Sequence, residues 1–263
     1  MPATSDFRLH DRLLERLRRA RSVLVLTGAG MSAESGIPTF RDAQTGMWSK
    51  YRPEELATPE AFAADPHRVW QWYESRRANV REAQPHAGHL ALVELESLLG
   101  QVNIVTQNVD GLHQRAGSSS VTELHGNILR SKCHLSLRPI GREWIEESAQ
   151  SPPRSPYVQG GLARPDVVWF GEQLPSAAVE AAIDAAARCD FCLSIGTTSL
   201  VQPAASLPLY ALEHGAALVE INPAQTPLSS RADQCFRGPA SEVLVTLVSQ
   251  LKQADHGNEG NAP

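Results

Sequence analysis

The sequence lacks several features that would place the protein in a special class. No apolar run approaches the roughly 20 residues of a membrane-spanning helix. The N-terminal stretch MPATSDFRLHDRLLERLRRARS has no apolar core segment, so a secretory signal peptide is not expected. The four cysteines form no regular framework, which favours a reducing, cytoplasmic compartment. No repeat of the length used by solenoid proteins occurs.

A block of basic residues is also missing, and the net charge is −5. Because duplex nucleic acid is bound through clustered Lys and Arg, we expect neither nucleic acid nor a membrane as a direct partner. The composition, 42% hydrophobic and 20% charged, is that of an ordinary globular domain.

The arginine-rich N-terminus predicts an amphipathic surface helix. A transit peptide would also be rich in Arg, but Asp6, Asp11 and Glu15 argue against one. The apolar face of the expected helix is formed by Leu9, Leu13, Leu14 and Leu17.

Short apolar runs alternate with helical patterns along the chain. The expected strands are Val23–Thr27, Val102–Thr106, Val167–Phe170, Phe191–Ile195 and Ala217–Ile221. The expected helices are Glu60–Ala64, Pro66–Glu82, His86–Leu99, Ala177–Ala187, Pro203–His214 and Ala240–Lys252. This order predicts an α/β fold, a Rossmann-like parallel sheet with helices on both faces. Ligands of such sheets bind at the carboxyl ends of the strands.

Residues 127–165 interrupt the alternation and are rich in Ser, Pro and Gly, so we interpret them as a small inserted lobe with loops. The whole of 1–252 is then one domain. Its large part covers about 12–56, 85–126 and 166–252, its small lobe about 57–84 and 127–165, and 253–263 form a polar tail.

The stretch VLTGAGMSAESGIPTFRD (25–42) contains a glycine turn after an expected strand. Gly28, Ala29 and Gly30 would let backbone N–H groups approach a phosphate, although they also fit an ordinary strand-to-helix turn. A dehydrogenase fingerprint would place glycine at Ala33 and an acid at the end of the next strand. Both are missing, which disfavours a hydride-transfer enzyme.

The segment GAGMSAESGIPTFRD (28–42) resembles the signature of sirtuins, which are NAD-consuming protein-lysine deacylases. The stretches TQNVDGLHQRAG (106–117), ELHGN (123–127) and RPDVVWFGE (164–172) agree in order and spacing, from about residue 20 to 245. The resemblance implies one catalytic domain. In its reaction, nicotinamide leaves the ribose while an acyl-lysine carbonyl oxygen attacks, giving free lysine and O-acyl-ADP-ribose.

The reaction needs a base for a ribose hydroxyl, and His125 is the candidate because imidazole titrates near neutral pH. Taken alone, LHGN also fits a histidine that caps a turn. The resemblance implies that Gln107 and Asn108 bind ribose hydroxyls and an ordered water, Asn108 with a catalytic role. Asp110 would accept from the nicotinamide amide, although NVDG also suits a plain turn. We interpret His113 as structural.

In the same loop, Phe40 would shield the reactive ribose from water until nicotinamide has left. Arg41 would bind phosphate or orient the loop, and Glu34 and Ser35 would fix it. Taken singly, the residues expected near the adenosine could be ordinary turns or caps. The NAD-binding residues that the resemblance implies are Gly28, Ala29, Gly30, Glu34, Thr39, Phe40, Arg41, Trp48, Gln107, Asn108, Asp110, Gly196, Thr197, Thr198, Asn222 and Ala240.

The stretch VVWFGE is expected to pair as an edge strand with the acyl-lysine peptide or protein substrate. Val168 and Phe170 would then line the lysine channel, with Gly171 beside them. A buried apolar strand is the alternative interpretation of VVWF.

The acyl group is indicated by a pair of residues on an expected helix. Tyr73 and Arg76 are three apart and share a face, and a hydroxyl beside a guanidinium makes a carboxylate site. With the small Ala57, the pair resembles the sirtuin branch that removes succinyl, malonyl and glutaryl groups. Acetyl would leave Arg76 without a partner charge, and a buried unpaired cation is costly. The alternative is a solvated face formed by Arg76 and Arg77, with Tyr73 in the core.

The sequence departs from the family at the zinc site, where most sirtuins carry two C-x-x-C pairs. The first pair reads CHLS, with Cys133 and Ser136, and the second reads SPYV, with Ser155 and Val158. Ser and Val cannot replace thiolates, and two ligands are too few even if His134 is counted. We therefore expect no zinc.

A second cysteine pair, Cys189 and Cys192, has the spacing of half a zinc site. No second pair lies nearby, and the run FCLSIG predicts at least one buried thiol, so no metal is expected there either.

Two further functions use the same motifs. The chain could be an NAD-binding acyl-lysine reader with weak turnover, or a protein mono-ADP-ribosyltransferase. A reader needs no ribose base, so the presence of His125 with Gln107, Asn108 and Asp110 argues for the enzyme. The sequence does not indicate the oligomeric state.

Overall fold

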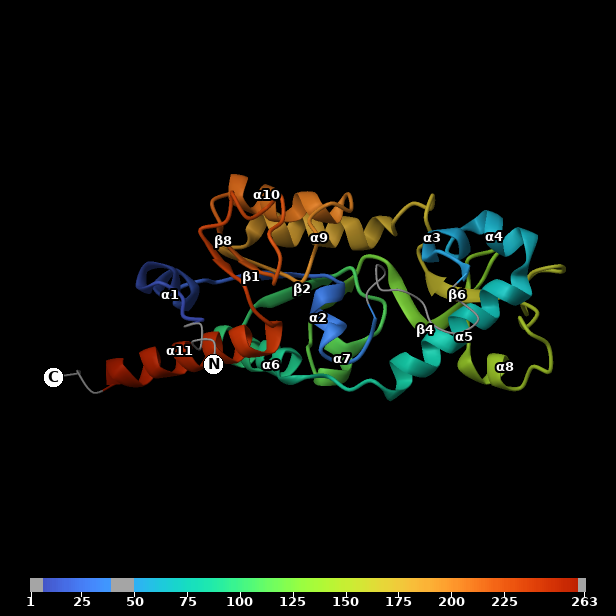
Figure 1. Cartoon of the computed structure of the whole chain (residues 1–263), viewed down its shortest axis with the longest axis horizontal. Coiled ribbons are helices and arrows are strands. Elements are labelled where there is room, and N and C mark those ends of the chain that lie inside the picture. The colour runs from blue at the N-terminus through green and yellow to red at the C-terminus, as the bar shows by residue number, and fades with distance from the viewer. Residues whose placement is uncertain (1–6, 39–49, 260–263) are drawn as a thin grey trace.

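Strand β1 (Val23–Thr27) lies at the centre of a six-stranded sheet in the computed structural model, which describes residues 7–38 and 50–259 (Figure 1). The order is β3-β2-β1-β7-β8-β9, and every neighbouring pair is parallel. The other strands are β2 (Val102–Thr106), β3 (Val121–Glu123), β7 (Phe191–Ile195), β8 (Ala217–Ile221) and β9 (Gln234–Phe236). The α/β prediction and four of its strands are confirmed residue by residue.

Helices cover both faces of this sheet, and the central strand is buried at every position. Val23 and Val25 pack against one helical layer, whereas Leu24 and Leu26 pack against the other. The first layer contains α1 (Asp11–Arg18), α6 (Ala87–Leu99) and α11 (Ala240–Glu259), and the second contains α9 (Ser176–Arg188) and α10 (Leu207–Glu213). Figure 1 shows α9 and α10 on one side of the sheet and α6 and α11 on the other.

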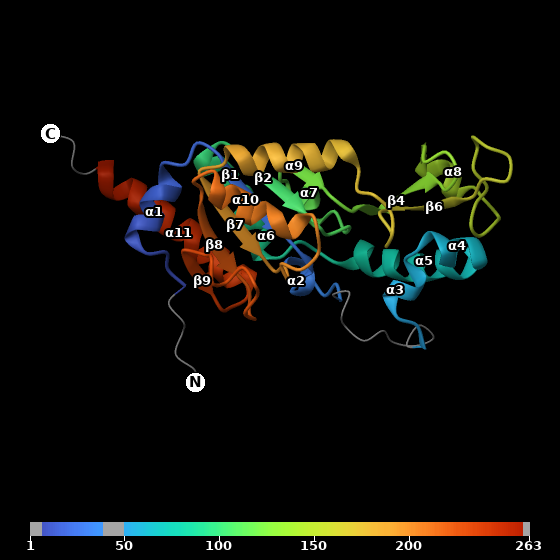
Figure 2. The same ribbon diagram turned by 90° about the horizontal axis from the view of Figure 1, so that it is seen from above.

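A second, antiparallel sheet has the order β5-β4-β6 and lies to one side of the large sheet, among further helices (Figure 2). Its strands are β4 (Gly126–Cys133), β5 (Pro139–Ile140) and β6 (Ala163–Val167), and the helices beside it are α3 (Pro53–Leu56), α4 (Pro59–Ala64), α5 (Pro66–Glu82) and α8 (Arg142–Glu146). The remaining helices are α2 (Ala29–Ala33), α7 (Leu112–Ala116) and the 3₁₀ turn η2 (Ala204–Ser206). The exact boundaries predicted for the large part and the lobe stay a prediction.

Residues 127–165, expected to be loops, thus contain strand structure. The register of β4 against β6 shifts between Asn127 and Ser131, and this bulge removes the period-two burial that a strand normally shows. The sequence pattern therefore could not reveal the longest strand of the protein's smaller sheet.

The expected strand Val167–Phe170 is wrong, because β6 ends at Val167. Beyond it, the Phe170 N–H donates to the Ala57 carbonyl, while the Trp169 N–H turns to the carboxylate of Glu172. A turn with Gly171 at φ +84° follows and ends the extended backbone.

Five of the six predicted helices differ from the structure at one or both ends. Helix α4 begins one residue earlier, at Pro59, and α9 is one residue longer at each end, from Ser176 to Arg188. His86 caps α6 with its side chain instead of forming its first turn, and Pro203–His214 divides into η2 and α10. Helix α11 continues to Glu259, so most of the expected polar tail is helical. In α1, Leu13 and Leu17 are buried against the sheet layer as expected.

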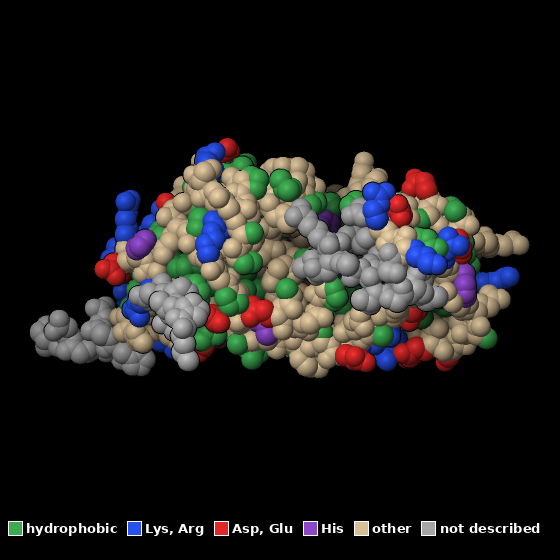
Figure 3. Space-filling view, in the orientation of Figure 1, with side chains coloured by type: hydrophobic (Ala, Val, Ile, Leu, Met, Phe, Trp, Pro, Cys, Tyr) green, Lys and Arg blue, Asp and Glu red, His purple; other side chains and the backbone are tan. Residues whose placement is uncertain are grey.

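On the face seen in Figure 3, Lys and Arg side chains lie in small groups among Asp and Glu. No helix in the described part of the chain combines the length and the apolar character needed to cross a bilayer.

The lobe has a buried arginine at its centre. Arg77 of α5 is 1% exposed, and its guanidinium donates to the carbonyls of Ile128 (2.6 Å) and Arg130 (2.8 Å) and to Glu74 (2.5 Å). Both carbonyls belong to the bulged part of β4, where regular ladder bonds are interrupted. Arg77 therefore replaces missing sheet hydrogen bonds and joins α5 to β4.

The substitution Arg77→Leu should lower the free energy of unfolding by about 3 kcal/mol, because unsatisfied buried acceptors cost about 1–3 kcal/mol each. Urea denaturation measures the change. Arg81→Leu, at an exposed position of the same helix, should change stability by less than about 0.5 kcal/mol. Equal effects of the two substitutions would contradict this role of Arg77.

Candidate active site

The parallel register brings the sequence motifs to one edge of the large sheet. Thr27, the last residue of β1, is aligned with Thr106 of β2 and Ile195 of β7, and Ile195 is aligned with Ile221 of β8. The chain therefore leaves four neighbouring strands side by side, at Gly28, Gln107, Gly196 and Asn222. This is the edge at which open parallel sheets bind their ligands.

Two of these turns are in close contact through glycines. The Gly30 N–H donates to the Gly196 carbonyl at 2.9 Å, and a Cβ on Gly30 would lie 2.7 Å from the Cα of Gly196. A Cβ on Gly196, whose φ is +59°, would lie 2.4 Å from the backbone nitrogen of Met31. The glycines predicted to approach phosphate thus have a second role, since only glycine lets the two turns touch.

A buried network holds the side chains that follow β2. The Asn108 amide donates to the Gly28 carbonyl (2.9 Å) and to the Ser32 hydroxyl (3.0 Å). Ser32 in turn donates to Asp110 at 2.7 Å, and burial raises the pKa of that carboxyl, although hydrogen bonds from Leu112 and Ser32 oppose the shift. The sequence reading missed Ser32, whose only signal was its place inside the glycine-turn motif.

His125 lies half-buried, two residues after the end of β3 at Glu123. Its Nδ1 is 2.9 Å from the Gln107 carbonyl, which can only accept, so Nδ1 carries the proton. Burial lowers the pKa of His125 below its usual value, and the bond to Gln107 offsets part of that shift. The neutral imidazole therefore keeps a lone pair on Nε2, as a general base requires.

His113 is structural, as predicted. It is buried behind the turn, with Nε2 at 3.0 Å from the Thr27 hydroxyl, and burial lowers its pKa to about 4. Its ring lies 5.0 Å from that of His89, whose pKa burial lowers to about 2. Both rings are thus neutral and act as polar packing under the glycine turn.

At the ends of β7 and β8, the polar groups predicted to contact the adenosine are hydrogen-bonded to one another or to neighbouring residues. The Asn222 amide donates to the Thr197 carbonyl at 2.6 Å, and Thr197 accepts from Ser199. Both carboxylate oxygens of Glu34 accept from Ser241, next to Ala240 at the start of α11. Thr198 lies in the same turn as Thr197. Four predicted residues, Thr39, Phe40, Arg41 and Trp48, lie outside the described residues.

The residues predicted to bind the acyl group come together in the core between α5 and β6. The Tyr73 hydroxyl is buried and accepts a hydrogen bond from the Trp169 indole at 2.9 Å. Arg76 packs over the Trp72 ring at 5.2 Å, and burial lowers its pKa. Ala57 is buried in the same cluster. Tyr73 thus lies in the core, as the alternative interpretation of this helix expected, but its hydroxyl takes part in a hydrogen bond.

The segment after β6 connects this cluster with His125. The Val168 N–H donates to the His125 carbonyl, and the Phe170 N–H donates to the Ala57 carbonyl, both at 2.9 Å. The Phe170 side chain is 49% exposed. Residues 168–170 thus run from the backbone of His125 to that of Ala57 in the acyl cluster, with Gly171 in the turn that follows.

At the positions of the family's zinc ligands, this chain has a single thiol, that of Cys133. Burial alone would raise the pKa of Cys133, but hydrogen bonds from Ser136, Ser155 and Leu135 outweigh it and lower the pKa to about 7. The Ser136 backbone N–H donates to the sulfur at 3.5 Å, whereas Val158 is 38% exposed. This donor set does not fit zinc. Among the described residues, no three His, Cys, Asp or Glu side chains are grouped as metal ligands.

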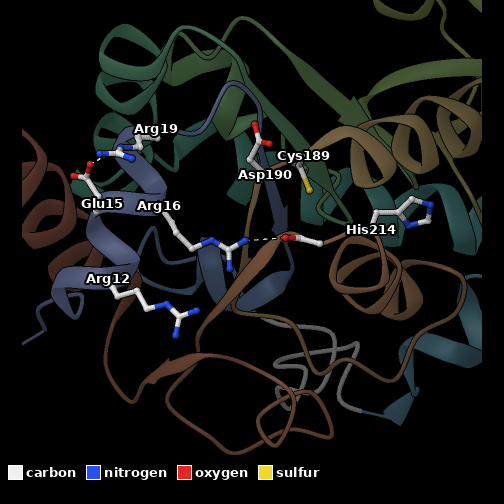
Figure 4. A pocket seen from close by; sticks show the side chains of 8 residues that line it. Arg12, Glu15, Arg16, Arg19, Cys189, Asp190 and His214 are labelled. Carbon is white, nitrogen blue, oxygen red and sulfur yellow. Dashed lines mark hydrogen bonds and ion pairs between the residues drawn. The ribbon is translucent and has the colours of Figure 1, made fainter.

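A cavity of about 440 Å³ lies at the opposite edge of the sheet, between α1 and the turns before β7 and β8 (Figure 4). Arg16 donates across it to the Gly215 carbonyl at 2.8 Å, and Arg19 pairs with Glu15. It contains none of the motif residues. The carboxyl edge, not this cavity, is the candidate active site.

The chain is similar to known proteins over most of its length. The model of the Sir2 family matches residues 28–203. NAD-dependent protein deacylase 1 of Pseudomonas aeruginosa is 48% identical over 242 residues, covering 90% of this chain and 96% of that protein. A crystal structure of a Sir2 homologue with NAD has a TM-score of 0.86 and 44% identity, and covers 94% of this chain and 95% of its own.

A further solved structure contains a Sir2 variant with deacetylated p53 peptide and 3′-O-acetyl ADP-ribose. It has a TM-score of 0.80 and 31% identity, and covers 91% of this chain and 97% of its own. With such matches over most of its length, the chain belongs to the Sir2 family.

Proposed function

We propose that this NAD-dependent protein deacylase removes succinyl and malonyl groups from lysine in preference to acetyl. The products would be nicotinamide, free lysine and O-acyl-ADP-ribose. The observation that carries the acyl preference is the buried hydroxyl of Tyr73, one helical turn from Arg76. Within residues 7–38 and 50–259, no group accepts the proton of that hydroxyl. A hydroxyl proton and a guanidinium suit the terminal carboxylate of a succinyl or malonyl chain.

For the reaction itself, we propose His125 as the base that removes a proton from a ribose hydroxyl. The bond from Nδ1 to Gln107 leaves Nε2 as the acceptor, and the lowered pKa keeps the ring neutral at pH 7. Asn108 and Asp110, joined through Ser32, would hold an attacking or leaving polar group at a fixed place. These groups lie on rigid strand ends, which suits their proposed roles.

We further propose that NAD lies across the glycine turns, with its phosphates at Gly28–Gly30 and its adenosine toward Thr197, Thr198 and Asn222. A Sir2 homologue has been solved with NAD and is 44% identical to this chain. The acyl-lysine peptide would lie along residues 168–170, between His125 and the acyl cluster. A cytoplasmic location stays a prediction from the cysteine content.

The acyl preference predicts that the parent enzyme cleaves a succinyl-lysine peptide with a higher kcat/KM than the matched acetyl peptide. The double variant Tyr73→Phe, Arg76→Met should lose about 100-fold in desuccinylation, because two hydrogen bonds to a charged group contribute about 1.5–3 kcal/mol each. The loss of kcat/KM that the double variant shows with acetyl-lysine should be at least about tenfold smaller, because acetyl has no carboxylate for these two side chains to bind.

The measurement is nicotinamide release on both peptides, with Arg81→Met as the control on the same helix. Equal rates for the two peptides in the parent, or a double variant that retains desuccinylation, would defeat the proposal.

We also propose that the small lobe folds without zinc. Its buried arginines support this view: Arg77 joins α5 to β4, and Arg164 pairs with Glu172 at 2.5 Å under the turn after β6. The Ser136 backbone N–H donates to the sulfur of Cys133, at a position where other members have a zinc-binding thiolate.

Elemental analysis of the purified protein should find far less than one zinc per chain, and a chelator should leave its thermal unfolding unchanged. One equivalent of zinc, or destabilisation by the chelator, would overturn this prediction.

A further inference from the structure

Trp169 is the one residue of the VVWFGE stretch whose side chain reaches into the acyl cluster with a polar group. Its ring is packed against the Arg164 guanidinium, 3.2 Å from the ring centroid, and against Phe62 at 5.4 Å. Its backbone N–H donates to Glu172 at 2.8 Å, and Glu172 makes two hydrogen bonds with Arg164. The indole is therefore fixed in position and orientation before any substrate binds.

The indole N–H determines how the Tyr73 hydroxyl can bond. An indole N–H only donates, so at this 2.9 Å contact the Tyr73 oxygen must accept. The hydroxyl proton is then turned toward a different partner. Burial raises the pKa of Tyr73, so the proton is retained at any pH at which the enzyme works. Without the indole N–H, the hydroxyl could rotate and accept from a substrate as readily as donate to it.

We propose that Trp169 is a positioning residue for acyl specificity, because it makes Tyr73 present a proton, and not a lone pair, to the end of the acyl chain. This inference rests on the proposed function, which places that end beside Tyr73 and Arg76. A guanidinium also only donates. The pair then matches a carboxylate, which only accepts, and rejects a carboxamide, whose NH₂ needs an acceptor that neither side chain offers.

The test compares two peptides of nearly equal shape, one with succinyl-lysine and one with the 3-carbamoylpropanoyl-lysine amide. The ratio of their kcat/KM values is measured for the parent, Trp169→Phe, Tyr73→Phe and the double variant. Trp169→Phe should lower the ratio about tenfold, mainly through KM, as expected for one buried hydrogen bond to a charged group. In the Tyr73→Phe background it should change the ratio less than about twofold, since there is no hydroxyl to orient.

Two further variants separate positioning from packing. Incorporation of 3-benzothienylalanine at position 169 keeps the ring shape and removes only the N–H, so it should act like Trp169→Phe even if the Phe variant folds poorly. Trp144→Phe removes an indole N–H that donates to the Arg154 carbonyl at 2.8 Å, and it should leave the ratio unchanged.

A ratio that Trp169→Phe and the benzothienyl variant leave intact would overturn the inference while the acyl preference stands. An equal drop with and without the Tyr73 hydroxyl would also overturn it, because the effect would then be structural. A parent ratio near one would also overturn the inference, whereas the proposed acyl preference is tested separately by the acetyl peptide.

Discussion

The contact between the turn after β1 and the turn after β7 is the constraint on which the rest of the site depends. Gly30 and Gly196 touch through their backbones, with no room for a Cβ on either. The Asn108 amide is bound to the Gly28 carbonyl, and the Asn222 amide to the Thr197 carbonyl. The loops after four parallel strands are therefore joined into one wall, and a shift of either glycine turn would move the polar groups of the other strands with it.

Burial selects the protonation states along this wall. His89 and His113 stay neutral beneath the glycine turn, where a charge would have no partner. His125 lies nearer the surface, and its pKa is lowered in the same direction while Gln107 fixes its tautomer. At the acyl end the same principle holds for Tyr73, whose proton is retained by burial and directed by Trp169. The site is thus preorganised by hydrogen bonds that exist before substrate arrives.

Four strands of the large sheet were predictable because they are mainly apolar runs that are buried between helices. The three-residue strands at its two ends, β3 and β9, were not predicted, because they are too short to show a pattern. The motif residues could also be placed at one edge, since parallel strands end together. The lobe was not predictable in detail, because the bulge at Asn127 and Ser131 hides the period of β4. The sequence likewise suggests that Arg77 is a surface charge. Its buried role becomes clear only in the structure, where it binds carbonyls of β4 at the interruption of the sheet hydrogen bonds.

The site residues that sequence reasoning missed act through distant partners. Ser32 binds Asn108 and Asp110, which are 76 and 78 residues away, and Trp169 binds Tyr73 at a separation of 96 residues. No local pattern encodes such pairs. Gly28 and Gly30 were predicted because a phosphate would need to approach their backbone. The structure adds a second reason, since a Cβ at either position would clash with the turn at Gly196 and Thr197.

The central claim is that a neutral imidazole at this sheet edge serves NAD-dependent deacylation. The most direct measurement is formation of O-succinyl-ADP-ribose from NAD and a succinyl-lysine peptide, followed by mass spectrometry from about pH 5 to 8 in the parent and in His125→Ala. The account predicts that the parent loses activity only below about pH 6.5, because burial lowers the pKa of His125. The variant should be at least about 100-fold slower and lack this acid limb. A variant that forms the product at the parent's rate, with the same pH profile, would contradict the account.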